Sequence, residues 1–116
     1  MTVPLPTPKE TQGETLEHMA QLFKALSDPM RLKILLHLRT LTGQDLVSCC
    51  AQPGQVCACD LEEVTGLTQP TVSHHMKVLT QAKLVRGEKK GKWMYYAIDP
   101  RGAESIQLFL PHITLT

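Results

Sequence analysis

A short turn between two helical segments constrains the fold of this chain more than any other feature. A short helix is expected from position 57 or 58 to Thr65, and Gly66 is placed to end it. Thr68 and Pro70 suit the cap and first turn of a second helix that should reach about Ala82. Two short helices joined by a three-residue turn containing glycine indicate a helix-turn-helix.

Two further helices are predicted before this pair. Apolar residues recur at helical spacing over residues 16–26, which indicates an amphipathic first helix. Asp28 as N-cap, with Pro29 in the first turn, begins a second helix that continues through Leu38. Glycine and proline then break the pattern over residues 42–56, which we interpret as an unusually long loop.

A hairpin, or wing, is expected after the helix pair. Residues 84–86 and 92–98 predict two strands, the second rich in aromatic side chains, and Gly87 and Gly91 bracket the polar connection. A last short helix over residues 103–110 would complete a dimer interface with the first helix. The expected fold class is mainly α with a β-hairpin, a winged helix-turn-helix that forms a homodimer.

The 116 residues fit one domain. Prolines among polar residues predict a disordered arm over residues 1–13, followed by the DNA-binding and dimerisation domain at 14–111 and a tail at 112–116. No apolar run has the length of a signal peptide or of the roughly 20 residues that span a bilayer. We therefore expect a soluble cytoplasmic protein with no membrane partner, whose cysteines are thiols.

Charge is unevenly placed, although the formal net charge is only +1. Residues 69–98 contain six lysines or arginines and one acid, whereas residues 40–76 contain four acids and no lysine or arginine. Single surface lysines are usually only solvated. Here the basic region coincides with the helix-turn-helix and the hairpin, so we expect it to meet the phosphates of DNA.

The second helix of the pair would present one apolar and one polar face. Val72, Met76 and Leu79 share the apolar face. Side chains at the N-terminal end and on the polar face should reach base edges, and hairpin cations should contact phosphates or the minor groove. The predicted DNA-binding residues are Gln69, Thr71, Ser73, His74, Lys77, Arg86, Lys89, Lys90 and Lys92. His75, at the flank of the apolar face, is interpreted instead as a hydrogen-bonded boundary residue.

Three stretches of sequence carry a family resemblance: LFKALSDPMRLKILLHL, CACDLEEVTGLTQPTVSHHMKVL and LVRGEKKGKWMYYAI. Together they resemble the ArsR/SmtB family of metal-responsive winged-helix repressors over about residues 22–98. Residues 57–61 are similar to the CxCDL core of its arsenite-sensing members. The resemblance implies a homodimer that represses an arsenic-resistance operon by binding double-stranded operator DNA, and that dissociates on binding arsenite or antimonite.

Four cysteines, Cys49, Cys50, Cys57 and Cys59, lie within eleven positions. Trivalent arsenic is soft and usually binds three thiolate sulfurs in a pyramid. Cys57 and Cys59 can reach one ion if Cys57 is at the helix cap or the first turn is distorted, because residues two apart on a regular helix point apart. The arsenic-sensing pattern often has a further cysteine where this chain has Glu62. We infer that Cys50, slightly favoured as the nearer, or Cys49 supplies the third sulfur.

These residues predict an inducer-controlled repressor with no catalytic cofactor, in which ion binding distorts the helix start and moves the DNA-reading helix. Zinc is a poorer match, because structural zinc sites favour CxxC pairs and Asp99 and His112 do not reproduce the last-helix ligands of zinc-sensing members. A redox-sensing or other heavy-metal-sensing repressor of the same fold is the alternative. A small thiol reductase is not expected. Such an enzyme needs an arginine near its nucleophilic cysteine, and no arginine lies between Arg39 and Arg86.

Overall fold

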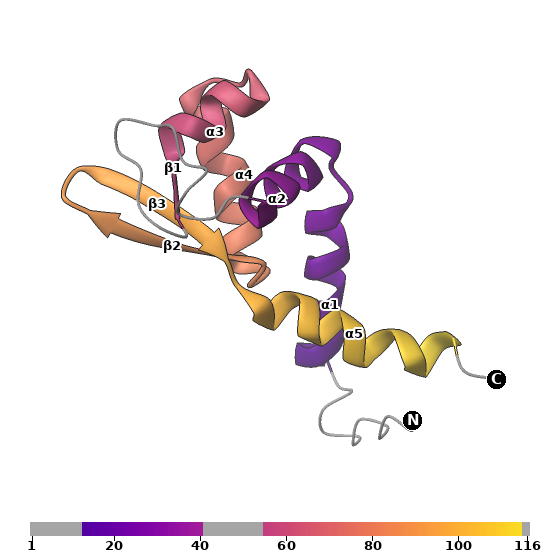
Figure 1. The fold of residues 1–116 in the computed structure, drawn as a ribbon. Coiled ribbons are helices and arrows are strands. Elements are labelled where there is room, and N and C mark those ends of the chain that lie inside the picture. The colour runs from indigo at the N-terminus through magenta and orange to yellow at the C-terminus, as the bar shows by residue number, and fades with distance from the viewer. Residues whose placement is uncertain (1–12, 41–54, 115–116) are drawn as a thin grey trace.

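Helices and strands follow the predicted order in the residues that the computed structural model describes, 13–40 and 55–114 (Figure 1). The helices are α1 (Gly13–Leu26), α2 (Pro29–Thr40), α3 (Ala58–Thr65), α4 (Gln69–Gln81) and α5 (Pro100–Thr114); the strands are β1 (Val56–Cys57), β2 (Val85–Lys90) and β3 (Trp93–Ile98). The expected mainly helical fold with a β-hairpin is confirmed. Cys49, Cys50 and the predicted arm, apart from Gly13, lie outside the described residues.

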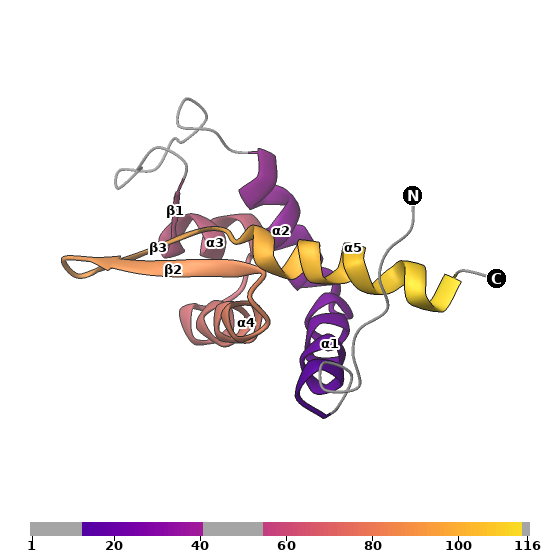
Figure 2. The ribbon, with the colours of Figure 1, turned by 90° about the horizontal axis from the view of Figure 1, so that it is seen from below.

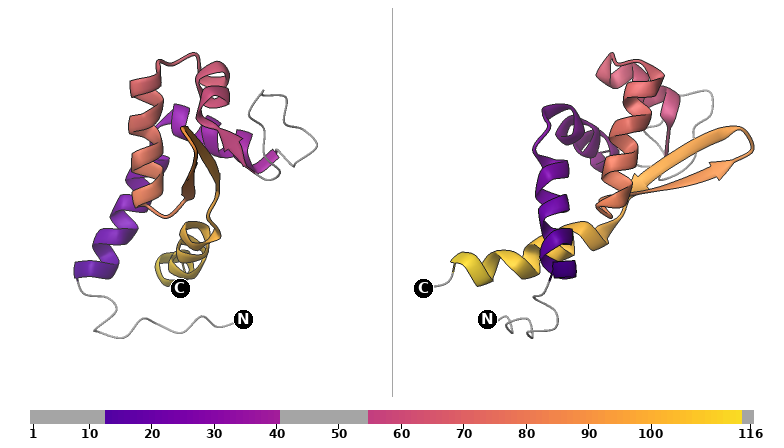
Figure 3. Two further views of the ribbon diagram at one scale, coloured as in Figure 1. Left: turned by 90° about the vertical axis from the view of Figure 1, so that its left-hand side faces the viewer. Right: turned by 180° about the vertical axis from the view of Figure 1, so that it is seen from behind.

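The predicted turn joins α3 to α4 at one end of the molecule (Figure 3). Gly66 ends α3 in the left-handed region, with φ 71°, and its N–H donates to the carbonyl of Glu62 at 2.9 Å. Thr68 occupies the N-cap of α4, but its hydroxyl lies 3.0 Å from the hydroxyl of Thr71 and makes no capping bond to the backbone. The predicted cap position is therefore confirmed, although the Thr68 side chain makes no bond that caps the helix.

The polar and apolar faces of α4 are placed as the spacing predicts. Val72, Met76 and Leu79 are almost fully buried in the core, together with Leu22, Ile34 and Leu61 from the three preceding helices. Burial of apolar side chains from every layer stabilises the fold by about 25 cal/mol per Å² removed from water. This packing fixes which side of α4 is left for solvent.

The sheet has three antiparallel strands in the order β1-β3-β2. Two features differ from the sequence prediction. Val56 and Cys57, expected in a loop and at a helix start, form β1 and pair with Tyr96 and Tyr95. Strand β2 also continues through Gly87 to Lys90, so the turn of the hairpin contracts to positions 91 and 92.

Gly87 lies within the strand because neighbouring side chains occupy the space that a larger residue would need. A Cβ atom there would lie 3.0 Å from side-chain atoms of both Met94 and Tyr96. The turn instead uses Gly91, whose φ of 64° is in the left-handed region that favours glycine. The hairpin projects from the helical body, with α4 alongside its base (Figure 2).

Helix α5 is longer than predicted, running over Pro100–Thr114 instead of residues 103–110. It begins earlier because the buried Asp99 accepts a bond from the N–H of Arg101 at 3.0 Å and pairs with its guanidinium at 2.7 Å. Its C-terminal end includes residues 112–114, which we expected in a tail. No helix in the described ranges is long and apolar enough to span a bilayer.

The start of α5 is held against the turn between α4 and β2. The N–H of Gly102 donates to the carbonyl of Lys83 at 2.9 Å, and the N–H of Asp99 donates to the carbonyl of Leu84 at 3.0 Å. A Cβ atom at Gly102 would lie 2.7 Å from both the Lys83 carbonyl oxygen and Leu84 Cδ2. Only glycine permits this close approach.

Replacing Gly102 with alanine should therefore destabilise the fold by about 1–3 kcal/mol, because the backbone of Lys83 would have to shift. Helix propensity alone predicts the opposite sign, a gain of about 1 kcal/mol. The midpoint of urea unfolding measures the change. Ala103→Gly, at the next and exposed position, is the control and should cost only the propensity difference. A Gly102→Ala variant more stable than the wild type would contradict the close packing.

Candidate nucleic-acid interface and cysteine site

The polar side of α4 is open to solvent. Gln69, Thr71, Ser73, His74 and Lys77 are all exposed, as expected of side chains that reach a partner. Their predicted contacts with DNA remain predictions. The neighbouring His75 is buried and hydrogen-bonded, which confirms its interpretation as a boundary residue.

A small pocket lies where the start of α4 meets α3 and β3. Gln69 and Ser73 line it from α4, Glu62 from α3, and Met94 and Tyr96 from the hairpin. The start of α4 is therefore set directly against the wing. Glu62, at the position where the arsenic-sensing pattern often has a cysteine, lines this pocket beside α4.

The cations of the hairpin do not share one face. Side chains alternate along a strand, and directly paired residues lie on the same face. Lys89 is paired with Met94, which lines the pocket beside α4. Lys89 therefore lies on the α4 side of the hairpin, whereas Arg86 and Lys90 lie on the opposite face. Lys92 is in the turn at the tip.

Lys90 also has contacts within the protein. Its Nζ lies 3.0 Å from Oε1 of Gln55, 3.3 Å from a carboxylate oxygen of Glu88 and 5.8 Å from the ring centre of Tyr95. Lys92, by comparison, lies 5.5 Å over the ring of the exposed Trp93. Lys90 thus ties the wing to the residue that precedes β1.

The two described cysteines converge at the start of α3. Cys57 is the N-cap, one of the two arrangements that the sequence left open, with an extended backbone at φ −70° and ψ 145°, and it is fully buried. Its Sγ lies 3.2 Å from Sγ of the half-buried Cys59. This separation exceeds a disulfide bond of about 2.05 Å. It is within the roughly 4.6 Å that two sulfurs can span around one ion with bonds of about 2.3 Å.

Both sulfurs can therefore contact one ion with α3 intact. The structure therefore shows the cap arrangement, because the extended backbone of Cys57 turns its side chain toward Cys59. Distortion of the helix start on ion binding stays a prediction. Within residues 13–40 and 55–114, no group of at least three His, Cys, Asp or Glu side chains could hold a metal ion. The predicted third ligand, Cys50 or Cys49, lies outside the described residues.

Sequence reasoning missed two residues that connect these surfaces. Gln55 contacts Lys90 of the wing, and no local pattern marks it. Arg31 contacts His75 of α4 at 3.0 Å. The available signal was the position of Arg31, three residues after the capping Asp28. The cap fixes the start of α2 and therefore the direction of the side chains in its first turn.

Comparison with known proteins places this architecture among transcriptional regulators. A family model described as a helix-turn-helix domain matches residues 26–88. The arsenical resistance operon repressor of Bacillus subtilis (strain 168) is 39% identical over 90 residues, covering 78% of this chain and 74% of the relative. That of Staphylococcus xylosus is 45% identical over 83 residues, covering 72% of this chain and 67% of the relative.

A solved structure shows the same fold. The homodimeric winged helix-turn-helix DNA-binding domain of a possible ArsR-family transcriptional regulator from Mycobacterium bovis is similar with a TM-score of 0.61. The match is 23% identical and covers 93% of this chain and 85% of that one. The relatives and the fold are those of DNA-binding regulators rather than enzymes, as the sequence predicted. The chain therefore belongs to the ArsR family of winged helix-turn-helix transcriptional regulators.

Proposed function

We propose that this regulator is a homodimeric repressor that binds operator DNA and dissociates when its cysteine thiolates bind trivalent arsenic or antimony. The observation that carries the proposal is the pair of sulfur atoms 3.2 Å apart at the cap of α3, one short turn before α4. The names of two relatives, arsenical resistance operon repressors, support the same class of inducer.

In this proposal α4 is the recognition helix. Its exposed N-terminal side chains, Gln69, Thr71 and Ser73, enter the major groove, where Gln can bond adenine at two positions and hydroxyls suit bases or phosphates. The wing adds positive charge beside it. Lys89, on the α4 face, and Lys92, at the tip, are best placed to neutralise phosphates on the adjoining backbone.

Ion binding acts through recruitment of the third sulfur. Because Cys57 and Cys59 already converge, the strain arises when Cys50 or Cys49 is drawn in from the segment before β1. That pull falls on β1, which is paired with β3 of the wing and continues directly into α3. Both DNA-contacting elements, the wing and α4, are thus connected to the ion site by rigid backbone.

The dimer is assigned to α1 and α5, which pack together away from the recognition helix (Figure 1). Phe23 and Phe109 join the two helices, with ring centres 6.1 Å apart. Beyond this contact, Leu16, Leu108 and Ile113 remain at least 50% exposed. Apolar side chains left exposed on these two helices favour contact with a second copy, and the homodimeric structure from Mycobacterium bovis supports this assignment.

Replacing Lys89 with alanine should weaken binding to a duplex from the region upstream of the chain's own gene. The slope of log affinity against log salt should fall by about one, because one phosphate contact is lost. Lys90→Ala, at the adjacent position on the opposite face, is the matched control and should change the slope less. Equal effects of the two substitutions would contradict the assignment of the α4 face to DNA.

Replacing Cys59 with serine should leave affinity for the same duplex almost unchanged and abolish its release by arsenite. Release is measured by fluorescence anisotropy under strong reductant, which prevents disulfide formation. Comparing Cys50→Ser with Cys49→Ser then identifies the third sulfur, since only its loss should impair release. A wild-type protein released by oxidant and indifferent to arsenite would establish the redox alternative instead.

Replacing Leu108 with glutamate should convert the dimer to a monomer, because a charge on the α5 surface would lose its water at the interface. Sedimentation should show the mass falling from about twice to once the 12.9 kDa of the chain. Leu36→Glu, at an equally exposed position on α2, is the control and should remain dimeric. Dissociation by both substitutions, or by neither, would argue against this interface.

A further inference from the structure

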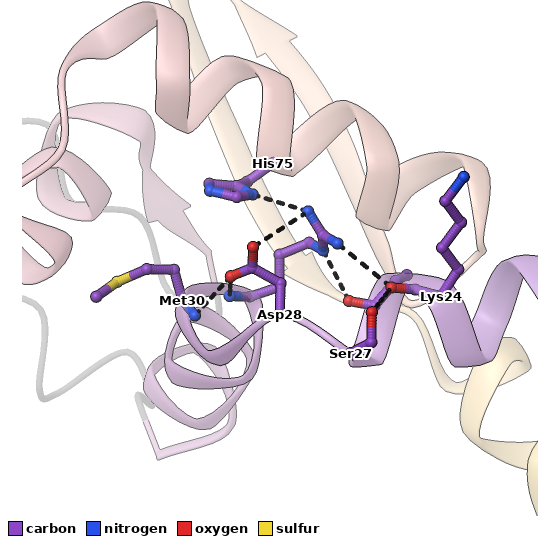
Figure 4. A network of polar contacts seen from close by, with 7 residues as sticks. Lys24, Ser27, Asp28, Met30 and His75 are labelled. Atoms are coloured by element: carbon purple, nitrogen blue, oxygen red, sulfur yellow. Dashed lines mark hydrogen bonds and ion pairs between the residues drawn. The ribbon is translucent and has the colours of Figure 1, made fainter.

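Arg31 joins the corner between α1 and α2 to the recognition helix through short polar contacts. Figure 4 shows this corner, with Lys24, Ser27 and Asp28 on one side and His75 of α4 on the other. Nε of Arg31 donates to the carbonyl of Ala25 at 2.7 Å, and Nη2 donates to the carbonyl of Lys24 at 3.3 Å. Its Nη1 lies 3.0 Å from Nδ1 of His75. The Arg31 side chain is only 12% exposed, so these contacts are largely shielded from water.

Asp28 holds the same arginine from the start of α2. Its Oδ1 caps the helix, as predicted, by accepting bonds from the N–H groups of Met30 at 2.8 Å and Arg31 at 3.4 Å. Its Oδ2 lies 3.9 Å from Nη1 of Arg31. One carboxylate therefore fixes both the start of α2 and the side chain that reaches α4.

The chemistry of the pair fixes the proton on His75. A guanidinium has only donors and does not lose its proton, so Nδ1 of His75 must be the acceptor. The imidazole is thereby held neutral, with its hydrogen on Nε2. A proton on Nδ1 would remove the acceptor and set two cations 3.0 Å apart in a side chain that is only 8% exposed.

We propose that Arg31 and His75 are positioning residues for the recognition helix, and that proton uptake by His75 weakens DNA binding although neither side chain touches DNA. The inference rests on the proposed reading of DNA by α4 and adds proton control to it. Contacts of Val72, Met76 and Leu79 with the core are not directional. The bond from Arg31 is directional, so it restrains the rotation of α4 about its axis.

The groups around His75 set the pH range of this effect. Burial is the largest influence and lowers the pKa of His75. The charge of Asp28 raises this pKa, whereas the charges of Arg31 and the neighbouring His74 lower it further. The side chain is therefore neutral at physiological pH. It takes up a proton only below the ordinary value of about 6.5.

The sign of the pH effect distinguishes this role from general electrostatics. Acidification charges exposed histidines and strengthens attraction to phosphates, which on its own increases affinity for DNA. Proton uptake at His75 acts in the opposite sense, because it breaks the bond that holds α4. A loss of affinity on acidification is therefore the signature of the positioning contact.

The test is the affinity of the full chain for a labelled duplex from upstream of its own gene, between about pH 5.5 and 7.5 at fixed ionic strength. The wild type should bind roughly fivefold more weakly at the acid end. His75→Asn should lose this acid weakening, because its amide oxygen accepts a bond and does not titrate. His37→Asn, on α2 and outside the predicted DNA-binding residues, is the control and should retain it.

Equal pH profiles for the wild type and His75→Asn would overturn the inference and leave the proposed function standing. Failure of the wild type to bind at any pH would contradict the proposed function, and the inference with it. If His75→Asn does not fold, the ring nitrogen chemical shifts of His75 in the wild type decide the question. An unprotonated Nδ1 at neutral pH supports the inference, and a protonated Nδ1 refutes it.

Discussion

One backbone position belongs to a strand and a helix at once, and the rest of the site depends on it. Cys57 pairs with Tyr95 in the sheet and also caps α3 with an extended ψ of 145°. A regular helix through this position would point Cys57 and Cys59 apart. Pairing with β3 requires the extended conformation instead, and that conformation brings the two sulfurs within 3.2 Å. The sheet therefore holds the Cys57 backbone in the conformation that brings the two sulfurs together.

Under the proposed function, this arrangement explains how the small cysteine site would control the larger DNA-binding surface. The residues before α3 are bonded to the wing by the β1–β3 ladder and by the contact of Gln55 with Lys90, 3.0 Å long. The residues after α3 reach α4 through a short turn that begins at Gly66, whose left-handed conformation favours glycine. A displacement of β1 is transmitted by backbone in both directions, so no separate hinge is required. Coupling of this kind depends on two arrangements of packed elements rather than on flexibility.

The sequence predicted the features that depend on residues close together in the chain. Gly66 and the pair Asp28–Pro29 fixed helix boundaries because caps and turns act within a few residues, and the apolar spacing of α4 identified its buried face. Strand β1 was not predictable, because two residues carry no periodic pattern and their partner strand lies far along the chain. The sequence placed the hairpin turn too early, at Gly87, for a related reason. Glycine is needed there because side chains of β3 approach closely, and that approach exists only in the folded chain. The Arg31–His75 contact likewise exists only in the folded chain.

The recognition helix is restrained at two separate places, and this allows two inputs to act independently. The cysteine pair acts on its N-terminal end through α3 and the turn, whereas Arg31 holds its middle from the corner between α1 and α2. Neither contact lies on the exposed face of α4 that we propose to meet DNA, so both can change without altering the side chains on that face. Because we assign α1 to the dimer, the arginine would connect the proposed partner-facing helix to the proposed DNA-reading one. A thiol-binding ion and a proton would then converge on the orientation of the same element by different routes.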